Sequence, residues 1–212
     1  MSDDGNRDRD HEHGRDEHHD DNGDEHQPVH GHGHDFGPVG AAVLTISTSR
    51  SLEDDPAGDV IAAAFEASGD EIVTRELVGD DYDGVQGAVD ALVDRDDVDV
   101  VVTTGGTGVT PDDVTVEAVE PLLEKELPGF GELFRELSRT EIGTRVVATR
   151  ATAGVVDGVP VFCLPGSEDA ARLGTEQIVV EEAGHLVGLA GRDTDGGDGD
   201  DRIGSAGEAN GS

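Results

Sequence analysis

Apolar stretches alternate with stretches of helical periodicity along the middle of this chain. The segments 39–48, 71–78 and 97–106 contain runs of branched apolar residues and predict strands. The first of them, VGAAVLTIST, is apolar almost throughout, which is typical of a strand covered on both faces of a parallel sheet. These three segments predict the centre of a sheet.

Helical signals fill the gaps between these strands. After the first strand, Asp55 is predicted as an N-cap, Pro56 lies in the first turn of the helix, and Gly69 marks its end. A second helix is predicted from four apolar residues that fall on one helical face: Val85, Val89, Leu92 and Val93.

The second half of this region continues the alternation. Thr115 is predicted as the N-cap of a third helix, and residues 131–137 form a short amphipathic fourth helix. Residues 145–165 are interpreted as two strands joined through a V-D-G turn, and a closing helix runs from Ser167 to about Leu189. Strands that alternate with helices predict an α/β fold with a mostly parallel sheet flanked by helices.

Composition divides the chain into one domain and two tails. Residues 1–38 form an acidic, histidine-rich segment with few apolar residues, and residues 192–212 form a second acidic segment. Neither segment has enough apolar surface to offset the entropy lost on ordering, so both are predicted to be disordered. Residues 39–191 are long enough for one α/β domain.

The chain is strongly acidic, with 49 Asp and Glu against 14 Lys and Arg and a formal net charge of −35. The acids are spread over every segment, so we interpret them as an adaptation to a cytosol of very high salt, which screens their repulsion. An acidic surface for a basic partner is the alternative. No basic stripe is present to neutralise phosphates, so nucleic acid is excluded as the expected ligand.

The single cysteine and the absence of long apolar runs bear on location. Cys163 has no partner for an intramolecular disulfide and is predicted to be a small buried apolar residue. No apolar run reaches the length of a membrane span, and the N-terminus has no signal-peptide apolar region. We therefore expect a cytoplasmic protein without membrane contact.

The third strand runs into the glycine-rich stretch TTGGTGVTPDD, residues 103–113. Glycines let backbone N–H groups approach a ligand closely, and a helix start nearby favours an anion. The loop lacks the Lys-Ser/Thr of a nucleotide P-loop, and a turn that only redirects the chain is the alternative. A second loop, LPGSEDA (164–170), has the same strand-to-helix layout. Two such loops at one sheet edge predict a ligand with a phosphate at one end and polar atoms at the other.

Four blocks in order carry a family resemblance: TTGGTG with an aspartate after four more residues, GFGELFRELS before EIGT, TRATAG, and LPGS before a helix. Together they resemble the MoaB/MogA family of molybdenum cofactor biosynthesis proteins. The resemblance implies a three-layer α/β/α sandwich, assembled as a homotrimer or homohexamer. It also implies transfer of AMP from Mg-ATP to molybdopterin, with a MoeA-type partner then inserting molybdate or tungstate. A non-catalytic molybdopterin-binding or scaffold protein is the alternative.

The resemblance also implies roles for individual residues. Asp113 matches the family's essential aspartate and Asp80 a second functional aspartate, and both are candidates for binding Mg²⁺. Glu132 is assigned either to pterin contact or to an exposed helix position. The expected substrate-binding residues are Ser47, Thr104, Gly105, Gly106, Thr107, Gly108, Gly166 and Ser167, with Glu132 as a further candidate. With few basic residues available, charge neutralisation is expected to depend on metal and backbone N–H groups.

Eight of the nine histidines lie between His11 and His34. Imidazoles mixed with carboxylates can bind Ni²⁺, Zn²⁺ or Cu²⁺, but the irregular spacing specifies no tetrahedral set. A solvated acidic tail is the favoured interpretation, and metal delivery is the alternative.

Overall fold

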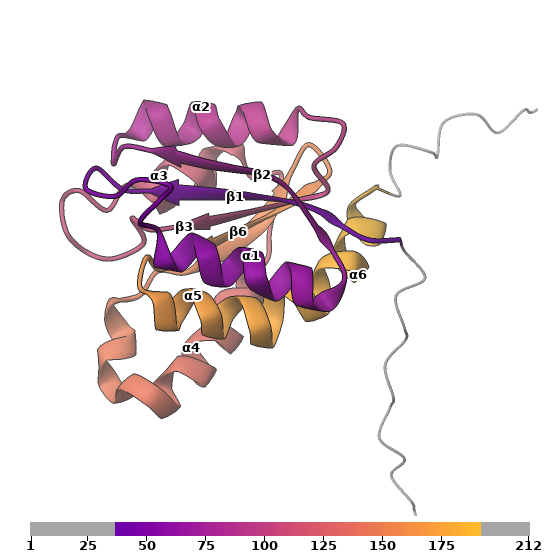
Figure 1. Cartoon of the computed structure of the whole chain (residues 1–212). Coiled ribbons are helices and arrows are strands. Elements are labelled where there is room, and N and C mark those ends of the chain that lie inside the picture. Colours follow the sequence, from indigo (N-terminus) through magenta and orange to yellow (C-terminus); the bar gives the residue numbers. More distant parts are fainter. Residues whose placement is uncertain (1–36, 192–212) are drawn as a thin grey trace, which may run out of the picture. The chain divides into compact units, whose positions relative to one another are not determined.

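The computed structural model describes residues 37–191 and contains a six-stranded sheet in the order β2-β1-β3-β6-β5-β4 (Figure 1). Strands β2, β1, β3 and β6 are parallel to one another, whereas β5 is antiparallel to both β6 and β4. The strands are β1 (Gly40–Ile46), β2 (Glu71–Val78), β3 (Val100–Thr104), β4 (Lys125–Glu126), β5 (Thr152–Val156) and β6 (Val159–Leu164). The mostly parallel sheet is confirmed.

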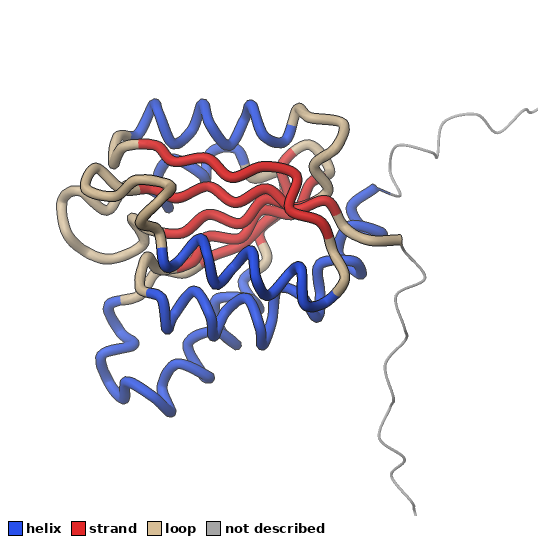
Figure 2. The backbone as a smooth tube through the Cα atoms, viewed as in Figure 1, coloured by secondary structure: helices blue, strands red, loops and turns tan. Residues whose placement is uncertain are grey.

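Helices cover both faces of the sheet, so the domain has three layers (Figure 2). Each face of the sheet has its own hydrophobic core cluster, and successive residues of β1 belong to different clusters. Val43 packs on the side of α1 and α5, and Leu44 packs on the side of α2. This alternation follows from the period of two along a strand. The helices are α1 (Pro56–Ser68), α2 (Tyr82–Val93), α3 (Thr115–Val119), α4 (Pro128–Ile142), α5 (Glu168–Gly174) and α6 (Val180–Ala190).

The predicted start and end of α1 are confirmed. The Asp55 carboxylate accepts a hydrogen bond from Gly58 N at 3.1 Å, and Pro56 occupies the first turn. Gly69 ends the helix in the left-handed region with φ 93°, a conformation that costs glycine little.

Other predicted boundaries are wrong in specific places. Residues 145–148 belong to the 3₁₀ helix η2 (Gly143–Ala148), so the first strand of the hairpin begins only at Thr152. Strand β4 was not predicted from the sequence. Thr115 is the first residue of α3 and not its cap, because the N-cap position is occupied by Val114. The Thr115 hydroxyl instead donates to Gly105 O at 2.8 Å, a contact between distant residues that local propensity does not encode.

Further differences concern the remaining helices and the ends of the chain. Helix α4 is longer than predicted, and the closing helix is interrupted by the π-helical turn η3 (Thr175–Val179) between α5 and α6. Another 3₁₀ turn, η1 (Glu120–Leu122), follows α3. The two predicted tails lie outside the described residues, apart from 37 and 38. Within residues 37–191, no helix is long and apolar enough to cross a membrane.

Cys163 lies in β6 and is fully buried, as expected. Burial raises the pKa of its thiol to about 11 from an ordinary value of 9.0. The folded thiol keeps its proton in a pH range where the unfolded thiol loses it. The stability contributed by the protonated form is therefore complete below pH 9.0 and is lost as the pH rises toward 11.

We expect a thiol reagent to modify Cys163 slowly at pH 8 and rapidly once urea unfolds the domain. Relative to Cys163→Ala, the wild type should lose up to about 1.4 kcal/mol of stability per pH unit above pH 9, because each unit of pKa difference has that free-energy equivalent. Modification kinetics and urea midpoints at pH 8 and 10 measure both effects. Rapid modification of the folded protein at pH 8 would contradict the assignment.

Candidate functional site

A cavity of about 480 Å³ opens where β1, β3 and β6 end. Because these strands are parallel, their carboxyl ends meet at one edge of the sheet, where α/β folds commonly bind ligands. The cavity is lined by Ile46, Ser47, Ser49, Arg50, Gly105, Gly106, Thr107, Gly108, Asp113, Arg145, Ala148, Thr149, Pro165, Gly166 and Ser167. Eight of the residues predicted from the sequence are in this lining.

The glycines of the first loop are required by its geometry. Gly105 has φ 109° and Gly106 has φ 64°, both in the left-handed region. A Cβ on Gly105 would overlap the Ile46 carbonyl oxygen, and one on Gly106 would overlap the Thr115 hydroxyl. Gly105 N also donates to Leu164 O at 3.0 Å, which ties the loop to β6. The turn is therefore built for close backbone approach, and an ordinary side chain does not fit at either position.

Asp113 stands at the end of this loop, half-buried, with its carboxylate turned back over the loop. Its Oδ2 accepts hydrogen bonds from Thr110 N at 2.7 Å and Thr110 Oγ1 at 2.6 Å. Partial burial acts to raise the pKa of Asp113, but the hydrogen bonds from Thr110 and Gly108 and the charge of Arg150 lower it below its ordinary value. The stability that this carboxylate contributes is present above its unfolded pKa and is lost as the pH falls through the folded one.

Arg150 holds the loop from the other side, a role that was not predicted from the sequence. Its Nε donates to Gly108 O at 2.7 Å, its Nη2 donates to Asp113 O at 3.0 Å, and its backbone N donates to Thr107 O at 3.0 Å. Its Nη1 forms an ion pair with Glu117, whose pKa is lowered chiefly by that hydrogen bond. Arg150 belongs to the TRATAG block, so its motif was visible but its contacts were not.

We expect Arg150→Gln to destabilise the domain by about 1–2 kcal/mol and to speed hydrogen exchange at Thr110 N, because two loop carbonyls lose a charged donor. Urea unfolding and amide exchange measure the two effects. The control is Arg172→Gln, which removes an exposed arginine paired with Glu168 and Glu176 on α5 and η3. Equal changes in both variants would contradict a specific contact to the loop.

The second loop, residues 165–167, packs directly against the first. A Cβ on Gly166 would lie 3.0 Å from Gly105 Cα. The Thr104 side chain is buried and donates to Pro165 O at 3.0 Å, so this residue holds the second loop rather than lining the cavity. Ser167 lines the cavity and also caps α5, where its Oγ accepts from Ala170 N at 3.4 Å.

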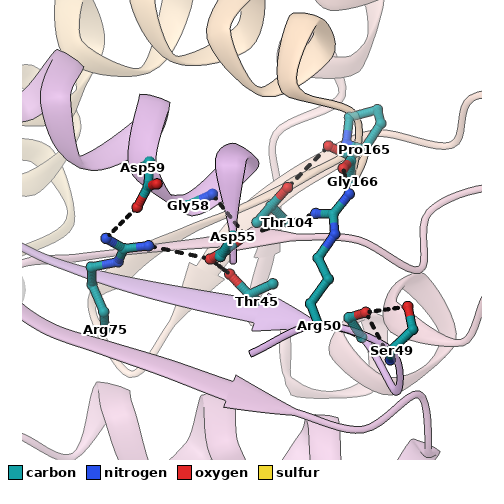
Figure 3. A network of polar contacts seen from close by, with 11 residues as sticks. Thr45, Ser49, Arg50, Asp55, Gly58, Asp59, Arg75, Thr104, Pro165 and Gly166 are labelled. Carbon is teal, nitrogen blue, oxygen red and sulfur yellow. Dashed lines mark hydrogen bonds and ion pairs between the residues drawn. The ribbon is translucent and has the colours of Figure 1, made fainter. Parts of the chain in front are cut away.

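A buried carboxylate, Asp55, anchors the wall beside the second loop (Figure 3). Its Oδ2 accepts from Thr45 Oγ1 at 2.6 Å and pairs with Arg75 Nη2 at 3.3 Å. Its Oδ1 lies 3.7 Å from Arg50 Nη1, and Arg50 Nη2 donates to Gly166 O at 3.1 Å. This network joins β1, the start of α1, β2 and the second loop around one charge.

The remaining predicted residues, Ser47, Asp80 and Glu132, lie in different parts of the structure. Ser47 lines the cavity, directly after β1. Asp80 follows β2 outside the lining, where its Oδ2 accepts from Thr48 N at 2.8 Å. Glu132 lies on α4 and lines two other cavities, one of about 540 Å³ shared with Arg150. Asp80 and Glu132 are therefore not brought into the same cavity as Asp113.

The cavity wall carries positive charge that was not predicted from the sequence. Arg50 and Arg145 both line it, so neutralisation of an anion is not left to metal and backbone N–H groups alone. Arg50 ends the segment STSR, which directly follows the first strand. Its position at the carboxyl edge of the sheet could therefore have been inferred from the sequence. Arg145 arrives through η2, the segment that was predicted as a strand.

Comparison with known proteins gives a consistent family assignment. The family described as "Probable molybdopterin binding domain" matches residues 42–185. Molybdenum cofactor biosynthesis protein B of Bacillus cereus is 42% identical over 146 residues, which cover 68% of this chain and 86% of that protein.

Solved structures agree as well. A crystal structure of a molybdenum cofactor biosynthesis protein B has a TM-score of 0.72 and 41% identity, covering 74% of this chain and 98% of that one. The tungsten cofactor synthesizing protein MoaB from Pyrococcus furiosus has a TM-score of 0.65 and 38% identity, covering 72% and 97%. The chain therefore belongs to the molybdopterin-binding domain family that includes the MoaB proteins.

Proposed function

We propose that this protein acts in biosynthesis of the molybdenum or tungsten cofactor, by transferring AMP from Mg-ATP to the terminal phosphate of molybdopterin. The single observation that carries the proposal is the Asp113 carboxylate at the cavity formed by the two loops, with its pKa held below the ordinary value. The names of the relatives support the pathway, and the family description supports molybdopterin as the ligand.

The proposed reaction is an in-line displacement. An oxygen of the molybdopterin phosphate attacks the α-phosphorus of ATP, and a new P–O bond forms there. The bond from the α-phosphorus to the bridging oxygen breaks, and pyrophosphate leaves with the electron pair. Such a reaction needs positioned phosphates and neutralised charge more than covalent help from the protein. The two loops supply backbone N–H groups for positioning, and Asp113 remains ionised at neutral pH.

The side chains present fit magnesium that arrives with ATP better than a resident metal. In residues 37–191, no group of three or more His, Cys, Asp or Glu could hold a metal ion. Mg²⁺ characteristically takes one or two carboxylates and completes its shell with water and substrate phosphates. Asp113 would supply a carboxylate from the cavity. Asp80, the other aspartate expected to bind the metal, follows β2 outside the cavity lining, so the described arrangement does not supply it as a second ligand beside Asp113. When bound, Mg²⁺ neutralises charge on the phosphate oxygens.

The proposal extends to partners. Adenylylated molybdopterin would pass to a MoeA-type protein that inserts molybdate or tungstate. A homotrimer or homohexamer is the proposed assembly, and exposed apolar side chains at Leu133, Ile142 and Val147 support a contact surface on α4 and η2.

The test is release of pyrophosphate by the full chain in multimolar KCl with molybdopterin and Mg-ATP, followed together with formation of adenylylated molybdopterin. We expect both products in equal amounts. Binding of molybdopterin without either product would overturn the catalytic proposal and favour a non-catalytic molybdopterin-binding protein. Absence of molybdopterin binding would overturn both.

A further inference from the structure

The cavity lining has more basic than acidic side chains, whereas the domain around it is strongly acidic. Residues 39–191 carry 31 Asp and Glu against 9 Lys and Arg. The cavity lining instead contains Arg50 and Arg145 and a single carboxylate, Asp113. In a chain that places acids on every segment, two arginines at one cavity indicate a ligand that is itself negatively charged.

Arg50 is the more firmly held of these two cations. Its Nη2 donates to Gly166 O at 3.1 Å, and its Nη1 lies 3.7 Å from the Asp55 carboxylate, whose side chain is fully buried. Asp55 is itself fixed by hydrogen bonds from Thr45 Oγ1 and Gly58 N. The guanidinium is therefore oriented before a ligand arrives, which reduces the entropy lost on binding.

These contacts leave further N–H donors of Arg50 at the cavity wall, and the side chain is 32% exposed. Guanidinium groups suit phosphate because their planar fork donates to two oxygens at once. A second, independent feature is Thr107, whose hydroxyl is buried in the lining and has no hydrogen-bond partner among the described residues. An unpaired buried hydroxyl is costly, and a polar ligand in the cavity would relieve that cost.

We propose that Arg50 is a phosphate-binding residue, preset by Asp55 and by the Gly166 carbonyl. The inference rests on the proposed function only for the identity of the ligand, which is a phosphate of ATP or of molybdopterin. Arg50 also connects the loop after β1 with the second loop, so phosphate bound to it lies between the elements that form the cavity.

The first test uses inorganic pyrophosphate as the probe, with binding measured by calorimetry in multimolar KCl. Arg50→Gln is expected to weaken binding about tenfold or more, because a charged hydrogen-bonding group is lost. Arg50→Lys keeps the charge without the fork and is expected to bind with intermediate affinity. Arg172→Gln, a surface arginine on α5, is the matched control and should leave binding unchanged.

A purely structural role for Arg50 predicts a different pattern. The double variant Arg50→Gln/Asp55→Asn removes the buried negative charge together with its partner, and so should recover stability lost in Arg50→Gln. Under our proposal it still binds pyrophosphate weakly. Affinity that recovers along with stability, or an Arg50→Gln protein that is folded and binds within about twofold of wild type, overturns the proposal.

A kinetic experiment identifies whose phosphate Arg50 holds. The KM for ATP and the KM for molybdopterin are measured separately for Arg50→Lys, and we expect one of them to rise. Unchanged KM values for both substrates in an active protein overturn the inference while the proposed function stands. Pyrophosphate binding that depends on Arg50, in a wild type that forms no adenylylated product, overturns the proposed function while the inference stands.

Discussion

Asp113→Asn is expected to lower the rate of pyrophosphate release by about 100-fold or more, the effect typical of removing one electrostatic group from a preorganised site. Asparagine keeps the size of the side chain and one oxygen that can accept from Thr110, so the loop should keep its shape. It lacks the negative charge that makes a carboxylate a strong ligand for a phosphate-bound Mg²⁺. The measurement is kcat in the pyrophosphate-release assay, with molybdopterin binding followed in parallel.

The matched control for this prediction is the adjacent Asp112→Asn. Asp112 is exposed and does not line the cavity, so the same loss of charge there should leave kcat unchanged. Asp80→Asn tests whether the second aspartate expected from the sequence acts in the reaction, although its carboxylate accepts from Thr48 N outside the cavity lining. If Asp113→Asn keeps the kcat of an active wild type, Asp113 is not the catalytic aspartate.

Asp55→Ala is expected to lower the free energy of unfolding by about 3 kcal/mol or more, because removing one member of a buried ion pair leaves the others uncompensated. Thr45 Oγ1, Gly58 N and two arginines would lose their acceptor, and α1 would lose its N-cap. The chain has no tryptophan, so urea unfolding in multimolar KCl is best followed by circular dichroism.

Asp59→Ala provides the control on the same helix and with the same partner. The Asp59 carboxylate also pairs with Arg75, at 2.8 Å, but its side chain is 62% exposed. Exposed pairs contribute little, and high salt screens them further, so we expect a change below about 0.5 kcal/mol. Comparable destabilisation by Asp55→Ala and Asp59→Ala would show that the burial of Asp55 does not account for its contribution to stability.

The parts of the site that were predictable from sequence are those encoded within a few residues. TTGGTG follows a buried strand, and the positive φ angles at Gly105 and Gly106 explain why glycine occupies both positions. The second loop is also encoded locally, because Pro-Gly-Ser directly follows β6 and precedes α5. Strand order could not be read in this way, yet it alone brings β1, β3 and β6 side by side and so puts both loops at one cavity.

The parts that were missed depend on contacts across the fold. Arg150 is 42 residues from Gly108, whose carbonyl it binds, and Arg50 is 116 residues from Gly166. Neither pairing follows from spacing, because nothing local distinguishes an arginine that binds a distant carbonyl from an arginine on the surface. Residues 145–148 show the opposite error, in which branched apolar residues favour a strand but the chain forms a 3₁₀ helix.

By itself, the sequence determined the alternation of strands and helices, the caps of α1, the two glycine-containing loops and the acidic character of the chain. These features depend on neighbouring residues or on composition, so they can be read without coordinates. Only the tertiary structure decided that Asp113 lines the cavity while Asp80 lies beside it, and that Arg50 is fixed there through Asp55. Those outcomes depend on which segments pack together, and packing is a property of the whole chain.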